Sequence, residues 1–132
     1  SVSGLVGEAH EYVNVHMTED ISVQDIADAL NVSRYYLSHE FKKSTGYGLW
    51  NYVISKRLVY SQKLLAEGAS VTEACYESGF KDYAHFIKSF TKTFGCSPKQ
   101  YGKSEETVRS RFYRCSCGHC YGVCHWDYSY EQ

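Results

Sequence analysis

The chain contains very little proline. Only one occurs among 132 residues, at position 98, where we expect it to stop a helix. A proline inside a helix costs about 3 kcal/mol, because it removes a hydrogen bond and its ring clashes with the preceding turn. Its near absence, together with abundant helix-forming residues, favours an all-α fold. The length suits one compact domain or two very small ones.

Long apolar runs are absent as well. No stretch approaches the roughly 20 apolar residues that a membrane-spanning helix requires. The first twenty residues carry no basic cluster ahead of an apolar segment, as a secretory signal would. The sequence therefore predicts a cytoplasmic protein without a membrane partner.

The sequence also lacks recognisable patterns of catalytic residues. No nucleophile–base pair, carboxylate dyad or phosphate-binding loop stands at a meaningful spacing. His10 and His16 resemble ordinary surface residues. We therefore expect no enzyme activity and, apart from a metal ion considered below, no cofactor.

Positive charge is missing from the first 32 residues, which hold six acids and no lysine or arginine. Residues 33–103 reverse this balance, with eleven lysines and arginines against five acids. A basic middle segment favours a polyanionic partner such as nucleic acid. The alternative is a solvated lysine surface without such a role.

The sequence does contain clear signals for helix starts, and these signals occur twice. A serine followed three residues later by an acid, the pattern of a capping box, occurs at Ser22 with Asp25 and again at Ser70 with Glu73. The two copies are offset by 48 residues before a tight turn and by 49 after it. Each copy predicts a short helix, a turn and a second helix that ends at glycine. That is the layout of a helix-turn-helix.

The second helices of the two copies are expected at about 33–45 and 82–94. A long helix over about 49–66 joins the copies, and at 1.5 Å per residue it would extend roughly 27 Å. Apolar spacing over residues 4–17 predicts a further helix before the first copy. The predicted architecture is thus two helix-turn-helix units joined by a long central helix.

Three phenylalanines in the second copy, Phe86, Phe90 and Phe94, fall on one helix face, which we expect to be core. Functional residues should then lie on the opposite face. In a helix-turn-helix the second helix enters the major groove of DNA, and its early residues contact base edges. The predicted base-reading residues are Tyr35, Ser38, His39, Tyr83, Ala84, Ile87 and Lys88.

Lysines and arginines near these helices would contact DNA phosphates, which position a protein without reading sequence. The predicted set is Arg34, Lys42, Lys43, Lys56, Arg57, Lys81 and Lys92. Arg57 has an alternative role as a structural residue of the long helix, bound to carbonyl groups or to Glu77. Because major-groove faces recur about every 34 Å, the central helix would let one chain insert both recognition helices into adjacent grooves.

The run GFKDYAHFIKSFTKTFGCSPKQY, residues 79–101, is the most specific feature of the sequence. With its matching first half, it resembles the AraC/XylS family of bacterial transcription regulators over about residues 5–101. The resemblance implies a seven-helix domain, within residues 1–103, that binds promoter DNA and often contacts RNA polymerase. Members of that family also carry an effector-binding or receiver domain, so we expect this segment to be the output domain of a longer parent chain. The alternative is a stand-alone regulator.

Residues 104–132 lie outside the resemblance and are rich in cysteine. Zinc favours thiolate ligands, and four of them make a structural site, although the spacing here differs from the usual pair of knuckles. The candidate ligands are Cys115, Cys117, Cys120 and Cys124. The alternatives are a disordered tail of reduced thiols, adventitious disulfides or an added extension. If the tail were the active part, the chain would be a metal- or redox-responsive module rather than a DNA-binding regulator.

Overall fold

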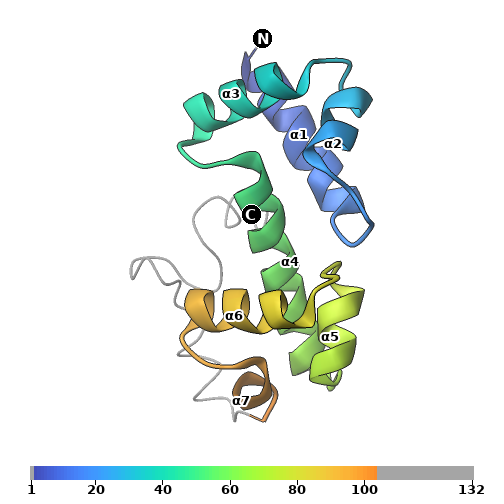
Figure 1. The fold of residues 1–132 in the computed structure, drawn as a ribbon, viewed down its shortest axis with the longest axis vertical. Helices are drawn as coiled ribbons and strands as arrows, with labels where there is room; N and C mark the ends of the chain where they lie inside the picture. The colour runs from blue at the N-terminus through green and yellow to red at the C-terminus, as the bar shows by residue number, and fades with distance from the viewer. Residues whose placement is uncertain (1, 104–132) are drawn as a thin grey trace. The chain divides into compact units, whose positions relative to one another are not determined.

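The computed structural model describes residues 2–103, which form seven helices and no strand (Figure 1). The helices are α1 (Val2–His16), α2 (Val23–Ala29), α3 (Arg34–Thr45), α4 (Leu49–Ala66), α5 (Val71–Glu77), α6 (Tyr83–Phe94) and α7 (Pro98–Gly102). The chain divides into two compact units inside α4. Unit 1 ends at Lys56 and unit 2 begins at Arg57. The predicted all-α fold is confirmed.

Unit 1 packs α1, α2 and α3 against one another (Figure 1). Val13, Ile26 and Leu37, one from each helix, are fully buried in its core. Phe41 of α3 and Tyr52 of α4 are buried as well, with ring centroids 5.8 Å apart. Burial of one such side chain contributes about 1.5–3 kcal/mol. This core holds the inner face of α3 and leaves its other face in solvent.

Backbone hydrogen bonds fix the turn between α2 and α3. Asn31 has a φ of 58°, a left-handed conformation that asparagine adopts more readily than most residues. The Val32 N–H donates to the Ala27 carbonyl at 3.0 Å. The Ser33 hydroxyl then accepts from the Tyr36 N–H at 3.0 Å and starts α3. The predicted start of this helix is confirmed.

Unit 2 repeats this turn between α5 and α6. Gly79 takes the place of the left-handed asparagine, with a φ of 104°. The Phe80 N–H donates to the Cys75 carbonyl at 3.1 Å. The Asp82 carboxylate accepts from the His85 N–H at 3.1 Å and starts α6. The two motifs share one backbone plan, as the offsets of 48 and 49 predict.

The short first helix of each motif begins with a complete capping box. In α2 the Ser22 N–H donates to Asp25 at 2.8 Å, and the Asp25 N–H donates to the Ser22 hydroxyl at 3.1 Å. In α5 the corresponding distances between Ser70 and Glu73 are also 2.8 and 3.1 Å. Both predicted caps are confirmed, and each contributes about 1 kcal/mol to its helix.

The core of unit 2 is built from phenylalanine. The helices α5, α6 and α7 contact one another (Figure 1). Phe86 and Phe90 are fully buried, with ring centroids 5.7 Å apart, and Phe94 follows at 4.7 Å from Phe90. Tyr101 of α7 lies 5.8 Å from the Phe90 ring. The inward face predicted for these phenylalanines is confirmed.

The structure corrects the role expected of Pro98. The preceding helix, α6, already ends at Phe94, ahead of a left-handed Gly95. Pro98 instead occupies the first turn of α7, where its missing N–H would have no partner within the helix. Ser97 caps this helix: its hydroxyl accepts from the Gln100 N–H at 3.1 Å.

The α4 helix contains 18 residues. Its Trp50 is exposed, whereas Tyr52 and Val53 are fully buried. Neither α4 nor any other helix among residues 2–103 is long and apolar enough to cross a membrane.

Candidate nucleic-acid interface

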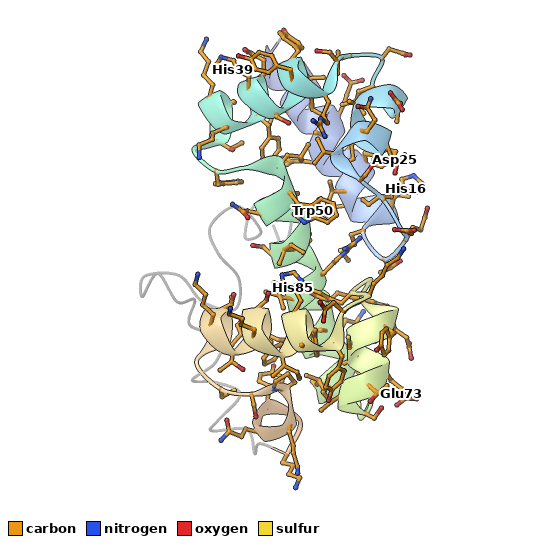
Figure 2. The ribbon with its side chains drawn as sticks, viewed as in Figure 1. His16, Asp25, His39, Trp50, Glu73 and His85 are labelled. Atoms are coloured by element: carbon orange, nitrogen blue, oxygen red, sulfur yellow. The ribbon has the colours of Figure 1, made fainter. Side chains whose placement is uncertain are left out.

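The outer face of α3 carries polar and basic side chains in solvent. Tyr35 is 81% exposed, and His39 projects from the helix (Figure 2). Ser38 lies half-buried beside them. The predicted phosphate ligands on this helix, Arg34, Lys42 and Lys43, are exposed as well. All the α3 residues assigned to DNA therefore stand away from the core.

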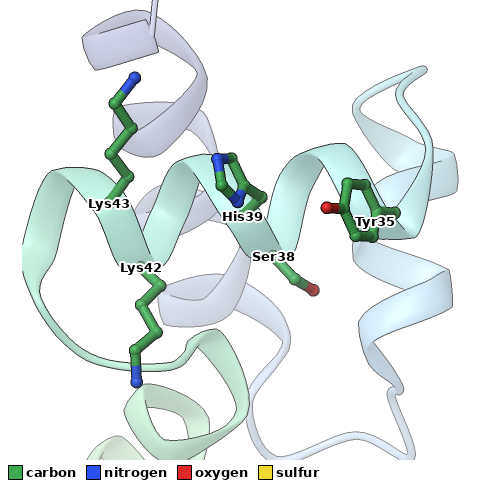
Figure 3. A pocket seen from close by; sticks show the side chains of 5 residues that line it. All are labelled: Tyr35, Ser38, His39, Lys42 and Lys43. Atoms are coloured by element: carbon green, nitrogen blue, oxygen red, sulfur yellow. The ribbon is translucent and has the colours of Figure 1, made fainter.

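Five of these residues line an open hollow of about 360 Å³ (Figure 3). They are Tyr35, Ser38, His39, Lys42 and Lys43. The Tyr35 and His39 rings, one helical turn apart, are nearly parallel, with 9° between their planes and 6.0 Å between their centroids. Figure 3 shows the two lysine side chains extending to opposite sides of the helix. The arrangement offers hydrogen-bond donors flanked by positive charge.

The outer face of α6 is less polar. Tyr83, Ala84 and Lys88 are exposed, and Ile87 is half-buried. The exposed Thr91 donates its hydroxyl hydrogen to the Ile87 carbonyl at 2.8 Å, which commits that donor to the helix itself. All four residues predicted to contact bases from this helix reach its solvent side.

Two residues of the predicted phosphate set do not fit that role. Lys56 is 8% exposed and Arg57 is 5% exposed. Both long side chains are buried, which long basic side chains achieve by packing their aliphatic stems. Their assignment to DNA phosphates is corrected, and burial agrees with the structural role considered for Arg57. Lys81 and Lys92 remain exposed.

His10 of α1 packs against the buried aromatic residues of α3 and α4. Its ring lies 5.3 Å from that of Phe41 in an edge arrangement and 4.7 Å from that of Tyr52. Burial, with a smaller effect from the positive charge of Lys56, lowers the pKa of His10 below its usual value of 6.5. The expectation that this histidine is ordinary surface is wrong. A lone histidine on an amphipathic helix carries no pattern that reveals such a contact.

No group of three or more histidine, cysteine or acidic side chains within residues 2–103 is arranged to hold a metal ion. The two cysteines in this range, Cys75 and Cys96, are both buried. Burial, with a smaller effect from the Asp82 carboxylate, raises the pKa of the Cys75 thiol. The cysteines proposed to bind zinc, Cys115 through Cys124, lie outside the described residues.

Known proteins share this arrangement of helices. A family model described as a helix-turn-helix domain matches residues 26–104, more than half of the chain. An AraC-type transcriptional regulator from Chromobacterium violaceum superposes with a TM-score of 0.70 at 26% identity, over 76% of this chain and 90% of that one. The chain belongs to the AraC family. The resemblance identified from the sequence is thereby confirmed.

Two further similar proteins are informative. The Msm operon regulatory protein of Streptococcus mutans is 34% identical over 104 residues, which is 78% of this chain and 37% of that protein. The DNA-binding domain of AdpA, solved in complex with a target DNA, has a TM-score of 0.69 at 26% identity and covers 74% of this chain and 88% of that one. The chain spans between 31% and 60% of the first three curated relatives.

Proposed function

We propose that this AraC-type chain binds double-stranded promoter DNA in a sequence-specific manner and regulates transcription. The observation that carries the proposal is the repeated motif, whose second helices, α3 and α6, bury one face and expose the other. The fold similarity to the AdpA domain, which was solved with its target DNA, supports it. In a helix-turn-helix the second helix enters the major groove with its early residues at the base edges.

The proposed roles follow the side-chain chemistry. Tyr35, Ser38 and His39 of α3 would contact one set of bases, and four residues of α6 the other set. The exposed cations Arg34, Lys42, Lys43, Lys81 and Lys92 would contact phosphates. Each such contact replaces counterions on the DNA and makes the affinity depend on salt.

The length of α4 supports the use of both motifs by one chain. Its 18 residues extend roughly 27 Å, which is close to the distance of about 34 Å between successive major-groove faces. One chain would then contact two adjacent grooves without forming a dimer.

The wider partners are proposals of the same kind. We propose that RNA polymerase is contacted at the promoter and that a sensor or receiver domain belongs to a longer parent chain. We also propose a non-enzymatic role and a cytoplasmic location. The longer curated relatives of the chain, which are regulatory proteins, support these proposals.

Zinc binding by the cysteine-rich tail stays a prediction. Native mass spectrometry of the whole chain would measure its metal content. One zinc ion per chain supports the site. No bound metal, together with unchanged DNA affinity after deletion of residues 104–132, would remove both the site and the alternative function.

Selection of bound sequences from a random pool of duplex DNA tests the main proposal. We expect one enriched site that spans two adjacent major grooves. The logarithm of affinity for that site should fall steeply with the logarithm of salt concentration, by about 0.9 for each phosphate contacted. A pool without any enriched sequence, or a slope below one phosphate equivalent, would contradict the proposal.

Lys88→Ala separates base reading from simple charge. We expect this variant to enrich a different set of bases at the positions that α6 contacts, because a base-contacting lysine discriminates between base edges. Lys63→Ala is the matched control, since Lys63 is exposed on α4 and outside the proposed contact set. An unchanged preference in Lys88→Ala would remove that residue from the base-reading group.

A further inference from the structure

The two recognition helices differ at equivalent positions. With the offset of 49, Tyr35 corresponds to Ala84, and Ser38 corresponds to Ile87. Both α3 residues have a hydroxyl group, and both α6 residues have only carbon and hydrogen in the side chain. The same backbone plan therefore presents two different chemistries to solvent.

A third equivalent pair extends the difference. Lys42 of α3 corresponds to Thr91 of α6. The Thr91 hydroxyl donates to the Ile87 carbonyl at 2.8 Å, so its hydrogen is already bonded within the helix. This hydrogen bond removes a donor from the outer face of α6. By helical spacing, Ala84 and Ile87 form an apolar strip that continues toward Thr91, between Tyr83 and Lys88.

Major-groove chemistry gives such a strip one natural target. Thymine carries a methyl group at C5 in the major groove, and alanine, threonine methyl and other apolar groups contact it. The α3 face is suited to the other features of base edges, because its tyrosine, serine and histidine exchange hydrogen bonds with acceptors and donors there.

We propose that α6 recognises thymine methyl groups through Ala84 and Ile87, whereas α3 recognises hydrogen-bonding base edges. The operator then consists of two chemically unlike halves, of which the half at α6 depends on thymine. This inference rests on the proposed function, since it assumes that both helices enter the major groove. It assigns to each helix the class of base feature that it reads.

Replacement of thymine by deoxyuridine tests the inference directly, because uracil keeps the hydrogen-bonding groups of thymine and lacks only the methyl. Removal of one buried methyl group weakens binding by about fourfold, which corresponds to about 0.8 kcal/mol. We expect this loss for each contacted thymine in the half at α6. In the half at α3 the same replacement should change affinity by less than about twofold.

The experiment uses the complete chain and the operator enriched from the random pool. The half that changes its base preference in Lys88→Ala is assigned to α6. Dissociation constants are then measured at one salt concentration for three duplexes: unmodified, with uracil in the α6 half, and with uracil in the α3 half.

Protein variants provide the matched controls. Ala84→Ser adds a hydroxyl at an exposed position, so it leaves the core intact and should reduce the uracil effect in the α6 half. Ile87→Val, which removes one methylene from a half-buried residue, should reduce it as well. Ser38→Ala alters only α3 and should leave the uracil effect in the α6 half unchanged.

The outcomes are distinguishable. A selective effect of uracil in the α6 half, reduced by Ala84→Ser, supports the inference. An enriched operator that has no thymine in that half, or that responds equally to uracil in both halves, overturns the inference and leaves the proposed function standing. A pool with no enriched site overturns both.

Discussion

Unit 1 and unit 2 repeat one helix-turn-helix backbone and differ in most of the side chains placed on it. In the first turn the Val32 N–H bonds to the Ala27 carbonyl at 3.0 Å, and in the second the Phe80 N–H bonds to the Cys75 carbonyl at 3.1 Å. The recognition helices end alike, at Gly46 and at Gly95. The comparison teaches that turns and caps define the motif, whereas the outer faces are free to diverge.

The two units also differ in charge. Residues 1–56 hold four lysines and arginines against seven acids, a balance of −3. Residues 57–103 hold seven against four, a balance of +3. A positive unit attracts a polyanion from a distance, and a negative one repels it except at its local basic face. The acids of unit 1 precede α3, apart from Glu40, which is buried. Three of the four basic residues of unit 1 lie on α3, the helix proposed to contact DNA.

Their cores differ as well. In unit 1 the His10 ring packs against those of Phe41 and Tyr52, whereas in unit 2 the Phe90 ring meets its phenylalanine neighbours edge to face. Burial lowers the pKa of His10, whereas a phenylalanine ring has no titratable group. The two units should therefore respond differently to acid, although they share a fold.

The largest expected effect comes from the equivalent core residues Phe41 and Phe90, both fully buried. Replacement of either by alanine should destabilise its own unit by about 3–5 kcal/mol, because the side chain leaves a cavity. Native-state hydrogen exchange of each variant would measure the loss unit by unit. If one substitution reduced hydrogen-exchange protection in both units, the two units would unfold together. Their stabilities could then not be compared separately.

The turn residues should give a smaller effect. Gly79→Ala should destabilise unit 2 by about 1–2 kcal/mol, because its φ of 104° is left-handed and a β-carbon is strained there. Asn31→Gly is the control at the equivalent position of unit 1, where glycine adopts a φ of 58° without strain. Denaturant unfolding measures both. Equal destabilisation by the two changes would mean that the turns are not equivalent.

The equivalent cations Lys43 and Lys92 should each contribute one phosphate contact. Alanine at either position should lower the slope of log affinity against log salt by about 0.9 for the enriched operator. Lys63→Ala should leave the slope unchanged. A change in only one of the two variants would show that only one motif is seated on the DNA.

Acidification should give the smallest of these effects. It should reduce the stability of the two units at different pH values. The pKa of His10 is lowered by burial, so the unfolded chain binds a proton that the folded unit resists. Its stabilising contribution is therefore present above about pH 6.5 and is lost as the pH falls below that value. The pKa of Glu73 is lowered by the hydrogen bonds from the Ser70 backbone and side chain. Its contribution is present above about pH 4.5 and is lost on further acidification.

Unfolding curves from about pH 8 to about pH 3 would resolve these two windows. His10→Phe should abolish the loss of stability that begins below about pH 6.5. Glu73→Gln, which keeps the acceptor oxygen of the cap, should abolish the lower one. An upper window that persists in His10→Phe would assign it to another group.

Local signals made most of the fold predictable from the sequence. Ser22, Ser33, Ser70 and Asp82 cap the helices that they were predicted to start. These signals work because a cap depends only on a side chain and the backbone three residues later. The start of α7 was missed for a related reason, since a proline near a helix end is equally typical of a stop and of a first turn.

Burial of charged residues was harder to predict. Lys56 and Arg57 are buried although their charge indicated a surface position. Such positions depend on what the rest of the chain packs against α4, which residue type alone does not encode. The outward faces of α3 and α6 were predictable, because a strong inward stripe fixes the opposite side.

The unlike outer faces of α3 and α6 have a geometric consequence. A regulator built from two identical halves fits a palindrome equally well in either direction. A chain with a polar tyrosine–histidine stack at one end and an alanine–isoleucine strip at the other has only one correct orientation. With the base contacts proposed above, such a chain would bind its operator in one direction only, and a domain joined to it would face one fixed side of that site.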